Sequence, residues 1–424
     1  MSDDAALDEF GVGSEGSNKS DTAVKSKQKT DDLQALEASP IEDWELLRLG
    51  DVLSFEYGDN LPADTREDGE IPVYGSNGQV DTHTEANVDT AGIIIGRKGS
   101  IGKGEFSINP FWAIDTTYYI SDNETSENLR FVYYLLQNMK LERLNAASAI
   151  PGLNRNDAYN LNTLIPPLSE QQKIATVLRT VDQAIQKTEE IIEQTRRAKT
   201  GIQQELFTQG YYDHRFFVET RVGELPESWR LEKIKNHTEL VSGAHVKSEL
   251  VSDDSSLTPY LTGPEDFDEL GFTMTKYTDE PTKFCKEGDT LVTVKGSGCG
   301  KSTFADRRAC ISRQLKALRP NGKLEELYLF YFVETKQKLL KSLAEGSAIP
   351  GLSNSHLTAL DIPIPSIEEQ RKVGEVLKKY DDRIVYEKKY KSQLQRLKHG
   401  LMQDLLSGDV RTADVDIEIP QEVA

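Results

Sequence analysis

The sequence is poor in cysteine and has no long apolar run. Its 424 residues include three cysteines, Cys285, Cys299 and Cys310, and no two of them form a Cys-x-x-Cys pair. This argues against a disulfide framework and favours reduced thiols in a cytoplasm. A zinc site shared with His245 or His356 is disfavoured, because the spacing fits no ligand knuckle. No stretch approaches the roughly 20 apolar residues that span a bilayer, and no early apolar segment indicates a secretory signal.

An excess of basic residues is also missing. The chain has 70 acidic and 50 basic residues and a net charge of −20, which taken alone argues against a nucleic-acid partner. Part of this charge lies at the ends, since residues 1–39 carry a net −5 and residues 409–424 a net −4. We expect the first segment to be a disordered acidic tail and the second to be an acidic C-terminal tail. Nucleic-acid binding requires only local basic patches.

The third absence concerns catalytic motifs. Residues 296–302 (GSGCGKS) resemble a phosphate-binding loop, but its first glycine would fall on Lys295, so the spacing fails. Residues 109–112 (NPFW) resemble the Asn-Pro-Pro-Phe motif of adenine methyltransferases, but the second proline is missing. No combination of carboxylates and lysine indicates a nuclease centre. We therefore expect a protein with no catalytic residues and no cofactor or metal of its own.

The sequence does contain a long internal repeat. Residues 148–153 (SAIPGL) recur unchanged as residues 347–352, and residues 170–174 (EQQKI) return as residues 369–373 (EQRKV). The matched positions are all 199 residues apart. One copy in each half of the chain indicates a two-fold-like molecule built from a single polypeptide.

Each copy is expected to combine short strands with a helix. In the first copy, apolar alternation broken by Gly, Pro, Asn and Asp predicts the strands. The expected strands are 46–55, 71–74, 93–95 and 116–120, and the expected helix is 129–144. The second copy follows the same plan, with Lys-Gly-Ser at 295–297 where the first copy has it at 98–100. We expect an α+β protein with globular units at 40–167 and 210–365.

A long helix is expected after each globular unit, at 168–209 and at 366–408. Neither segment has an internal proline, and Gly210 and Gly408 are the expected terminators. Apolar residues in alternating 3- and 4-residue steps form a heptad seam on each helix. The seam residues are Ile174, Val177, Val181, Ile185 and Ile192 on the first helix and Val373, Val376, Tyr380, Tyr390, Leu394, Leu397 and Leu401 on the second.

The two seams are expected to pair with each other. Connectivity then makes the helices antiparallel, because each helix begins at the end of the pair where the other one stops. A regular helical stretch of about 39 residues in each segment would extend roughly 58 Å at 1.5 Å per residue. The expected architecture is two globular units joined by an antiparallel coiled coil, with a pseudo-two-fold repeat. The alternative is two unrelated surface helices, each packed on its own unit.

Basic residues gather at matching places in the two units. Residues 93–104 hold three basic and no acidic residues, and their glycines would let backbone amides approach phosphates. Residues 283–319 hold nine basic and three acidic residues. Arginine suits guanine, and asparagine or glutamine suits adenine. The expected DNA contacts are Tyr74, Ser76, Asn77, Arg97, Lys98, Ser100, Lys103, Lys295, Ser297, Lys301, Arg307, Arg308, Arg313 and Gln314.

The chain resembles the specificity subunits of type I restriction–modification systems over about residues 41–408. The resemblance rests on residues 71–78 (IPVYGSNG), 94–102 (IIGRKGSIG) and 115–119 (DTTYY), and on the Pro…Glu-Gln-x-Lys start of both long helices. It implies two target recognition domains, each reading one half of a split DNA sequence, with antiparallel helices as a ruler between them. The second unit departs from the pattern, since it has no Tyr-Gly-Ser-Asn-Gly string.

The resemblance also implies partner proteins. Two methylation subunits would dock on the helices, carry S-adenosylmethionine and methylate adenine. Restriction subunits would add translocation and cleavage driven by ATP and Mg. The chain itself would have no enzymatic activity and would determine the DNA sequence at which its partners act.

Two other functions remain open at this point. A coiled-coil assembly scaffold would bind only proteins and would show no salt-dependent retention of DNA. A self-contained modifying enzyme would transfer methyl groups without partners, which the missing motifs disfavour.

Overall fold

The computed structural model of the protein describes residues 41–147, 152–345, 351–421 and 423. The chain forms two compact units. Unit 1 comprises Met1–Asp182 and Arg396–Ala424, and unit 2 comprises Gln183–Gln395. The acidic segment 1–39 and most of the two SAIPGL strings lie outside the described residues.

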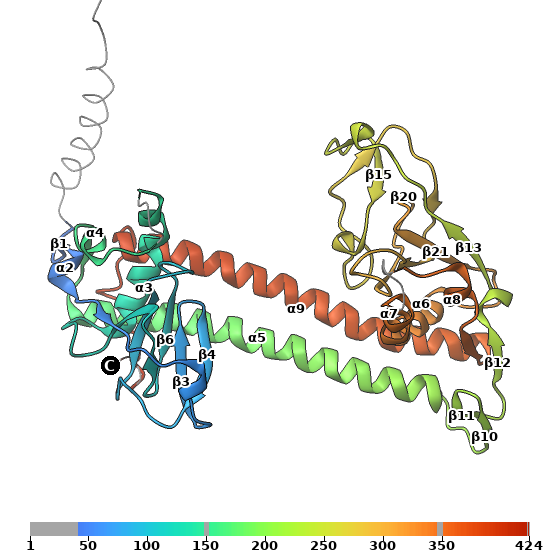
Figure 1. Ribbon diagram of the computed structural model, residues 1–424, viewed down its shortest axis with the longest axis horizontal. Helices are drawn as coiled ribbons and strands as arrows, with labels where there is room; N and C mark the ends of the chain where they lie inside the picture. Colours follow the sequence, from blue (N-terminus) through green and yellow to red (C-terminus); the bar gives the residue numbers. More distant parts are fainter. Residues whose placement is uncertain (1–40, 148–151, 346–350, 422, 424) are drawn as a thin grey trace, which may run out of the picture. The chain divides into compact units, whose positions relative to one another are not determined.

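Unit 1 combines small sheets with short helices (Figure 1). Its strands are β1 (Glu45–Arg48), β2 (Glu56–Tyr57), β3 (Ile71–Gly75), β4 (Gly78–His83), β5 (Gly92–Gly96), β6 (Gly104–Ser107), β7 (Trp112–Ala113), β8 (Thr117–Ile120) and β9 (Asn162–Ile165). Its short helices are α2 (Leu49–Val52), α3 (Leu129–Met139) and α4 (Arg155–Tyr159). One sheet has the order β2-β8-β5-β6, another has the order β4-β3-β7, and β1 pairs with β9.

Unit 2 is built in the same way. Its strands are β10 (Phe217–Thr220), β11 (Gly223–Pro226), β12 (Arg230–Lys233), β13 (Thr238–Ser242), β14 (Val251–Ser252), β15 (Thr258–Leu261), β16 (Tyr277–Thr278), β17 (Phe284–Cys285), β18 (Thr290–Thr293), β19 (Ser302–Phe304), β20 (Ala309–Ile311), β21 (Leu315–Pro320) and β22 (Asp361–Ile364). Its short helices are α6 (Glu326–Thr335), α7 (Gln337–Glu345) and α8 (Asn354–Thr358). The main sheets have the orders β13-β21-β18-β19 and β14-β16-β15-β20-β17, and β12 pairs with β22.

Each strand pairing of unit 1 has a counterpart of the same direction in unit 2. The parallel pair β3–β7 is matched by β15–β20. The antiparallel pair β5–β8, in which Gly96 faces Thr117, is matched by β18–β21, in which Thr293 faces Leu315. The prediction of a mixed α+β fold with an internal repeat is therefore confirmed. Unit 2 adds β14, β17 and the hairpin β10–β11.

Two local predictions need correction. The expected strand 46–55 is wrong over its middle, because Leu49–Val52 form helix α2, with Leu49 and Val52 buried three residues apart on one face. The expected helix 129–144 ends early at Met139. Lys140 adopts a left-handed φ of 52°, which stops an α-helix, and the chain continues as the 3-10 helix Leu141–Ala147.

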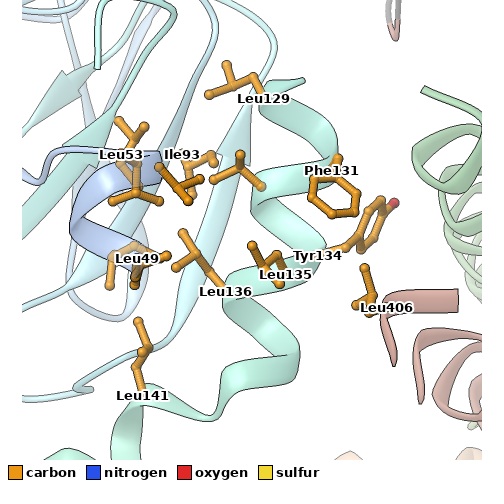
Figure 2. Packing of buried hydrophobic residues seen from close by; sticks show 14 of the residues in the cluster. Leu49, Leu53, Ile93, Leu129, Phe131, Tyr134, Leu135, Leu136, Leu141 and Leu406 are labelled. Atoms are coloured by element: carbon orange, nitrogen blue, oxygen red, sulfur yellow. The ribbon is translucent and has the colours of Figure 1, made fainter. Parts of the chain in front are cut away.

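The core of unit 1 lies around α3. Leu136 of α3 is buried with Ile93 of β5 and Leu49 of α2, and Figure 2 shows its side chain on the side of α3 toward them. Tyr134 points from another side of α3 toward Leu406, which belongs to the last turn of the long helix α9, Ile367–Ser407 (Figure 2). Because a buried leucine truncated to alanine costs about 2–5 kcal/mol, these contacts fix α3 on the sheet and on the helix end.

Two long helices of 41 residues complete the units. They are α5 (Leu168–Thr208) and α9 (Ile367–Ser407). Gly210 and Gly408, just beyond them, adopt left-handed φ of 90° and 80°, so the predicted terminators are confirmed.

The two long helices run in opposite directions within each unit. In unit 1, Lys398 contacts Asp182 at 2.7 Å, and Arg411, beyond the end of α9, contacts Glu170 near the start of α5 at 2.9 Å. The ion pairs of unit 2 are Lys391–Glu189 at 2.6 Å and Lys199–Asp381 at 2.8 Å. In both units, positions that increase along α5 pair with positions that decrease along α9.

The buried stripe on the helices differs in part from the expected seam. Ile174, Val181, Ile192, Val373 and Leu394 are buried, and Val177, Ile185, Val376, Tyr380 and Leu401 are partly buried. Tyr390 and Leu397 are exposed, so their placement in the seam is wrong. The stripe on α9 instead passes through Ile384 and the polar residues Asp381 and Glu387, which an apolar pattern cannot show.

A matching polar set lies at the helix pair in each unit, partly buried in unit 1 and buried in unit 2. In unit 1, the Tyr134 hydroxyl donates to Asp182 at 2.8 Å, and Lys398 contacts the same carboxylate. The corresponding set in unit 2 is Tyr331, Asp381 and Lys199, again with 2.8 Å between the hydroxyl and the carboxylate. In both sets the aspartate belongs to one copy of the repeat and the lysine to the other.

The segment after α9, which the sequence predicts to be an acidic C-terminal tail, packs on unit 1 in the part that the structure describes. Arg411 pairs with Glu170 and lies 5.5 Å from the ring centroid of Trp44. Thr412 N donates to Glu170 at 2.9 Å, and Val423 is buried. Burial acts to raise the pKa of Glu170, but hydrogen bonds from Arg411, Trp44 and Thr412 outweigh it and hold that pKa below the ordinary 4.5.

The described residues show neither a metal-ligand cluster nor a membrane span. No group of three or more His, Cys, Asp and Glu side chains among them could hold a metal ion. The thiols of Cys285, Cys299 and Cys310 are buried and form no disulfide. No helix in the described ranges is long and apolar enough to cross a bilayer.

Candidate nucleic-acid interface

In unit 1, a tight loop follows β5 and carries Lys98 near its tip. Hydrogen bonds from Gly96 N to Lys103 O at 2.9 Å and from Gly102 N to Gly96 O at 2.8 Å close its base. Gly99 and Gly102 have left-handed φ of 76° and 71°, and a Cβ atom on Gly96 would lie 2.0 Å from a carbonyl oxygen of the loop. The backbone geometry therefore requires these glycines, while Lys98 and Lys103 are exposed.

Unit 2 has the same loop after β18, one residue longer. Thr293 N donates to Lys301 O at 2.8 Å, as Gly96 does to Lys103 in unit 1, and Gly296 has a left-handed φ of 86°. The Lys-Gly-Ser tip at 295–297 therefore occupies the place that 98–100 has in unit 1. Lys295, Ser297 and Lys301 are all exposed.

A second loop lies against the first in both units, between β7 and β8 and between β20 and β21. The matched hydrogen bonds are Arg97 N to Thr116 O at 2.9 Å in unit 1 and Val294 N to Gln314 O at 2.7 Å in unit 2. These bonds make Thr116 equivalent to Gln314, and therefore Asp115 equivalent to Arg313. Arg313 and Gln314 are exposed.

A third segment approaches the second loop at a glycine. A Cβ atom on Gly58 would lie 2.2 Å from Ile114 O in unit 1, and one on Gly243 would lie 2.1 Å from Ser312 O in unit 2. No side chain fits at either position, so close backbone contact requires both glycines. The three segments thus form one loop frame, which is present in both units.

Arg97 is directed at the protein and not at solvent. Its Nη2 donates to the Asp115 carbonyl at 2.6 Å, and its guanidinium carbon lies 5.0 and 5.8 Å from the ring centroids of Tyr57 and Tyr118. Arg155 of α4 lies 4.9 Å from the Tyr57 ring. These contacts hold the backbone of the second loop, so Arg97 acts on it as a positioning residue.

The charge at the loop tips differs between the units. In unit 1, Lys98 and Asp115 form a loose pair with 3.7 Å between Nζ and Oδ2, and about half of each side chain is exposed. Such surface pairs contribute little to stability, so both groups stay available to a ligand. In unit 2, burial and the charge of Lys295 lower the pKa of Lys316. The position that is equivalent to Asp115 is occupied in unit 2 by Arg313. The tip of unit 2 is therefore the more positive one.

The turn between β3 and β4 lies beside the first loop of unit 1. The Ser100 hydroxyl donates to Asn77 Oδ1 at 3.1 Å, and a Cβ atom on Gly99 would lie 3.1 Å from Ser76 Oγ. The structure thus brings together Ser76, Asn77 and Ser100, which are neighbours of Lys98.

Three of the predicted contacts lie elsewhere. Tyr74 is partly buried and packs edge-on against Phe111, with 5.9 Å between the ring centroids, so its ring belongs to the core. Arg307 pairs with the preceding aspartate at 2.7 Å, and Arg308 lies 3.5 Å from the centroid of a phenylalanine ring. Both precede β20, whereas Arg313 follows it, so the strand separates them from the loop frame.

In unit 2 the two-residue turn is replaced by the connection 262–276 between β15 and β16. Pro264 lies against the first loop. Glu269 contacts Arg196 of α5 and contacts Lys388 of α9 at 2.6 Å. Partial burial acts to raise the pKa of Glu269, but hydrogen bonds from Lys388 and Arg196 outweigh it and lower that pKa. This connection therefore ties the β-rich part of unit 2 to both helices.

The sequence reasoning missed several residues of these surfaces. A cavity of about 380 Å³ beside Arg313 and Gln314 is lined by His245, Tyr260 and Lys276 among others. These residues are far apart in sequence, and no local motif joins them. Tyr57 directly precedes a required glycine, which was the one available signal in unit 1.

The same three-segment frame, present once in each unit, agrees with the comparison to known proteins. A family model described as type I restriction modification DNA specificity domain matches residues 41–196 and 226–396. The chain belongs to this family. Each matched range contains one complete loop frame and most of one long helix, so the duplication is one of whole specificity domains.

Individual relatives agree with this assignment. The type I restriction enzyme MjaVIII specificity subunit of Methanocaldococcus jannaschii is 25% identical over 403 residues, which cover 88% of this chain and 95% of the relative. The crystal structure of a type I restriction-modification system S subunit from M. genitalium has a similar fold, with a TM-score of 0.63 and 18% identity over 87% of this chain and 97% of that chain. A chain from a structural study of type I R-M system assembly gives a TM-score of 0.53 at 18% identity, over 87% of this chain and 99% of that chain. The protein is a DNA-recognition subunit of the type I class.

Proposed function

We propose that the protein reads a bipartite DNA sequence, one half-site with each unit. Target recognition domain 1 comprises residues 40–167 and target recognition domain 2 comprises residues 210–365. The observation that carries the proposal is that both domains present the same loop frame with a Lys-Gly-Ser tip, while the exposed side chains around the tip differ. Two similar frames with different side chains suit two different half-sites.

Within each domain, the lysines of the first loop contact phosphates and the neighbouring loops reach base edges. Lysines at glycine-rich turns suit phosphate, because backbone N–H groups and the ammonium group act together. The proposed contacts in domain 1 are Ser76, Asn77, Lys98, Ser100 and Lys103, and those in domain 2 are Lys295, Ser297, Lys301, Arg313 and Gln314. Arg307 and Arg308 would reach only DNA that extends beyond the loop frame.

Helices α5 and α9 set the distance between the half-sites. Each has 41 residues, which gives roughly 60 Å at 1.5 Å per residue. Their opposite directions and the ion pairs in each unit support a stiff antiparallel spacer. Two half-sites on the same face of B-DNA lie about 34–36 Å apart for each helical turn between them. A spacer of roughly 60 Å is longer than one such turn, so the two domains can contact separate segments of the major groove.

The chemistry belongs to partner subunits. Two methylation subunits that carry S-adenosylmethionine would methylate adenine at the site, and restriction subunits with ATP and Mg would add translocation and cleavage. The relatives named above are restriction-enzyme subunits, which supports an assembly of this kind. This chain recognises the DNA site and contributes no catalytic group.

The test is methylation by the assembled complex. The chain, combined with the methylation subunits of its own system, is incubated with unmethylated genomic DNA, and the modified adenines are mapped. A split motif with a constant gap is expected, together with binding that weakens steeply between 50 and about 200 mM salt, as phosphate contacts require. Salt-independent retention of DNA, or no motif at all, would support the protein scaffold instead.

A further inference from the structure

The repeat separates the exposed residues of the loop frame into two groups. Lys98, Ser100 and Lys103 of domain 1 have the same residue type at the equivalent positions of domain 2, namely Lys295, Ser297 and Lys301. Residues that are the same in both domains cannot make the domains prefer different half-sites. They therefore suit the contacts that every DNA sequence offers, which are the phosphates.

Discrimination must come from exposed positions at which the two frames differ. The second loop has such a position at its tip, where domain 1 has Asp115 and domain 2 has Arg313. The equivalence is fixed by backbone hydrogen bonds on both sides: Thr117 N to Ile114 O at 2.9 Å matches Leu315 N to Ser312 O at 3.0 Å, and the Thr116 and Gln314 carbonyls accept from the first loop. A carboxylate that only accepts hydrogen bonds thus stands where a guanidinium that only donates them stands in the other domain.

We propose that this pair of equivalent positions assigns opposite base edges to the two half-sites, with Arg313 reading a guanine and Asp115 reading the amino group of a cytosine. The proposal rests on the function proposed above and names its specificity. Arginine donates two hydrogen bonds to guanine O6 and N7, and aspartate accepts one from cytosine N4. The two residues therefore select opposite strands of a G·C pair.

The surroundings of each residue fit this role. Arg313 is exposed, borders the 380 Å³ cavity and is followed by Gln314, which is exposed and can read an adjacent adenine. Asp115 is about half exposed, and its carbonyl is held by Arg97 at 2.6 Å, so the backbone that carries it is fixed. Lys98, 3.7 Å away, offsets the repulsion that a carboxylate would meet near phosphates.

The alternative is that Asp115 only neutralises Lys98. That alternative gives no role to Arg313 other than phosphate binding, and it predicts that replacing either residue changes affinity for all sequences alike. The proposal predicts a change in the bases that the complex recognises, whereas the alternative predicts only a change in the strength of binding.

The experiment uses the full chain assembled with its methylation subunits and a duplex library with randomised half-sites. Methylated adenines are read from sequenced products for the wild type and for Arg313→Ala and Asp115→Ala. Lys103→Ala and Lys301→Ala are the matched controls, because they alter shared positions of the same frames and leave the Lys98–Asp115 pair intact. Arg313→Ala should lower discrimination at one guanine of one half-site by about 10- to 100-fold and leave the other half-site unchanged. Asp115→Ala should do the same at one cytosine of the other half-site, and the controls should leave all letters unchanged.

The outcomes separate the two levels of proposal. No split motif from the wild type would overturn the bipartite function itself. A split motif with the same bases after both substitutions would overturn only the assignment of Arg313 and Asp115. An equal loss of methylation at all sequences, like that of the lysine controls, would do the same. If Arg313→Ala does not assemble, Arg313→Lys decides by the same criterion, since lysine keeps the charge and loses the bidentate geometry.

Discussion

The side chain of Arg97 supports the second loop of unit 1. Its guanidinium donates to the Asp115 carbonyl and lies against the rings of Tyr57 and Tyr118. At the equivalent place unit 2 has Val294, which is buried. An apolar side chain can thus occupy this position in the frame, and the arginine is a feature of one domain only.

Replacing Arg97 with methionine tests this positioning role. The substitution keeps the length of the side chain and removes the hydrogen bond and the cation–π contacts, so unit 1 should lose about 2 kcal/mol of stability. Chemical denaturation measures the loss. The control Lys103→Met alters an exposed lysine of the same loop and should change stability by less than about 0.5 kcal/mol. A variant as stable as the wild type, with one phosphate contact fewer in the salt dependence of binding, would show that Arg97 faces DNA.

At the residue scale, the sequence identified the tips of the frame but not their supports. Lys98 and Lys295 were predictable because the Lys-Gly-Ser string repeats. The role of Arg97 was not, because it depends on Tyr57 and Tyr118, which come from strands β2 and β8. The packing of Tyr74 was not predictable for a similar reason, since its partner Phe111 lies on a distant segment.

Among the elements, the connection 262–276 has the clearest mechanical role in unit 2. Its Glu269 is largely buried and contacts one cation on each long helix. No local pattern indicated this role, because the cations lie on two helices far away in the sequence.

Replacing Glu269 with glutamine should loosen the β-rich part of unit 2 on its helices. Target recognition domain 2 would then be held less firmly on the proposed spacer helices. The assembled complex should therefore also methylate sites in which the gap between the half-sites differs by one base pair from the preferred gap. Methylation of duplexes with varied gaps measures this. Glu265→Gln is the matched control, since Glu265 is exposed and its contacts, with Lys276 at 3.9 Å and with the Thr262 hydroxyl at 2.9 Å, stay within the same connection. Equal gap selectivity in both variants would argue against the role of Glu269.

The segment after α9 should respond to acid through Glu170. The pKa of Glu170 is lowered in the folded protein, so its stabilising effect is complete above the ordinary value of 4.5 and is lost as the pH falls through the lower folded value. Hydrogen exchange of residues 409–421 should therefore rise at low pH. Glu170→Gln should raise it already at pH 7, whereas Glu205→Gln, on an exposed face of the same helix, should not. Unchanged protection in Glu170→Gln would mean that other contacts hold the segment.

At the scale of elements, the sequence was informative for the helices and weaker for their packing. The bounds of α5 and α9 lie within one residue of the expected 168–209 and 366–408, because glycine and proline mark the ends. The seam was placed partly wrongly, since Asp381 and Glu387 are buried on α9. Charged residues at buried positions do not stand out in an apolar pattern.

For the molecule as a whole, the proposed spacer makes a quantitative prediction. Insertion of one heptad into α5 between Ile185 and Ile192, and of one into α9 between Ile384 and Lys391, keeps the buried stripe in phase. The helices lengthen by about 10 Å, which corresponds to about three base pairs at 3.4 Å each. Mapping of methylated sites should show the same half-site letters with a gap longer by about three base pairs.

A heptad in only one helix is the control. It shifts the ion pairs of one helix against the other, so the complex should lose activity without gaining a new gap. An unaltered gap after the double insertion would contradict the spacer. The general plan of the chain was predictable because the repeat spans most of it. The attachment of residues 409–421 and 423 to unit 1 was not, because the composition of this segment resembles that of a tail.

The polar sets at the helix pair make the evolution of the two halves of the gene interdependent. Asp182 is completed by Lys398, and Asp381 is completed by Lys199, so each acid depends on a base encoded in the opposite half. A lineage that reverses the charge at one of these sites must make its compensating change some two hundred codons away. The loops can drift toward new target sequences separately, while these helix positions have to evolve in pairs.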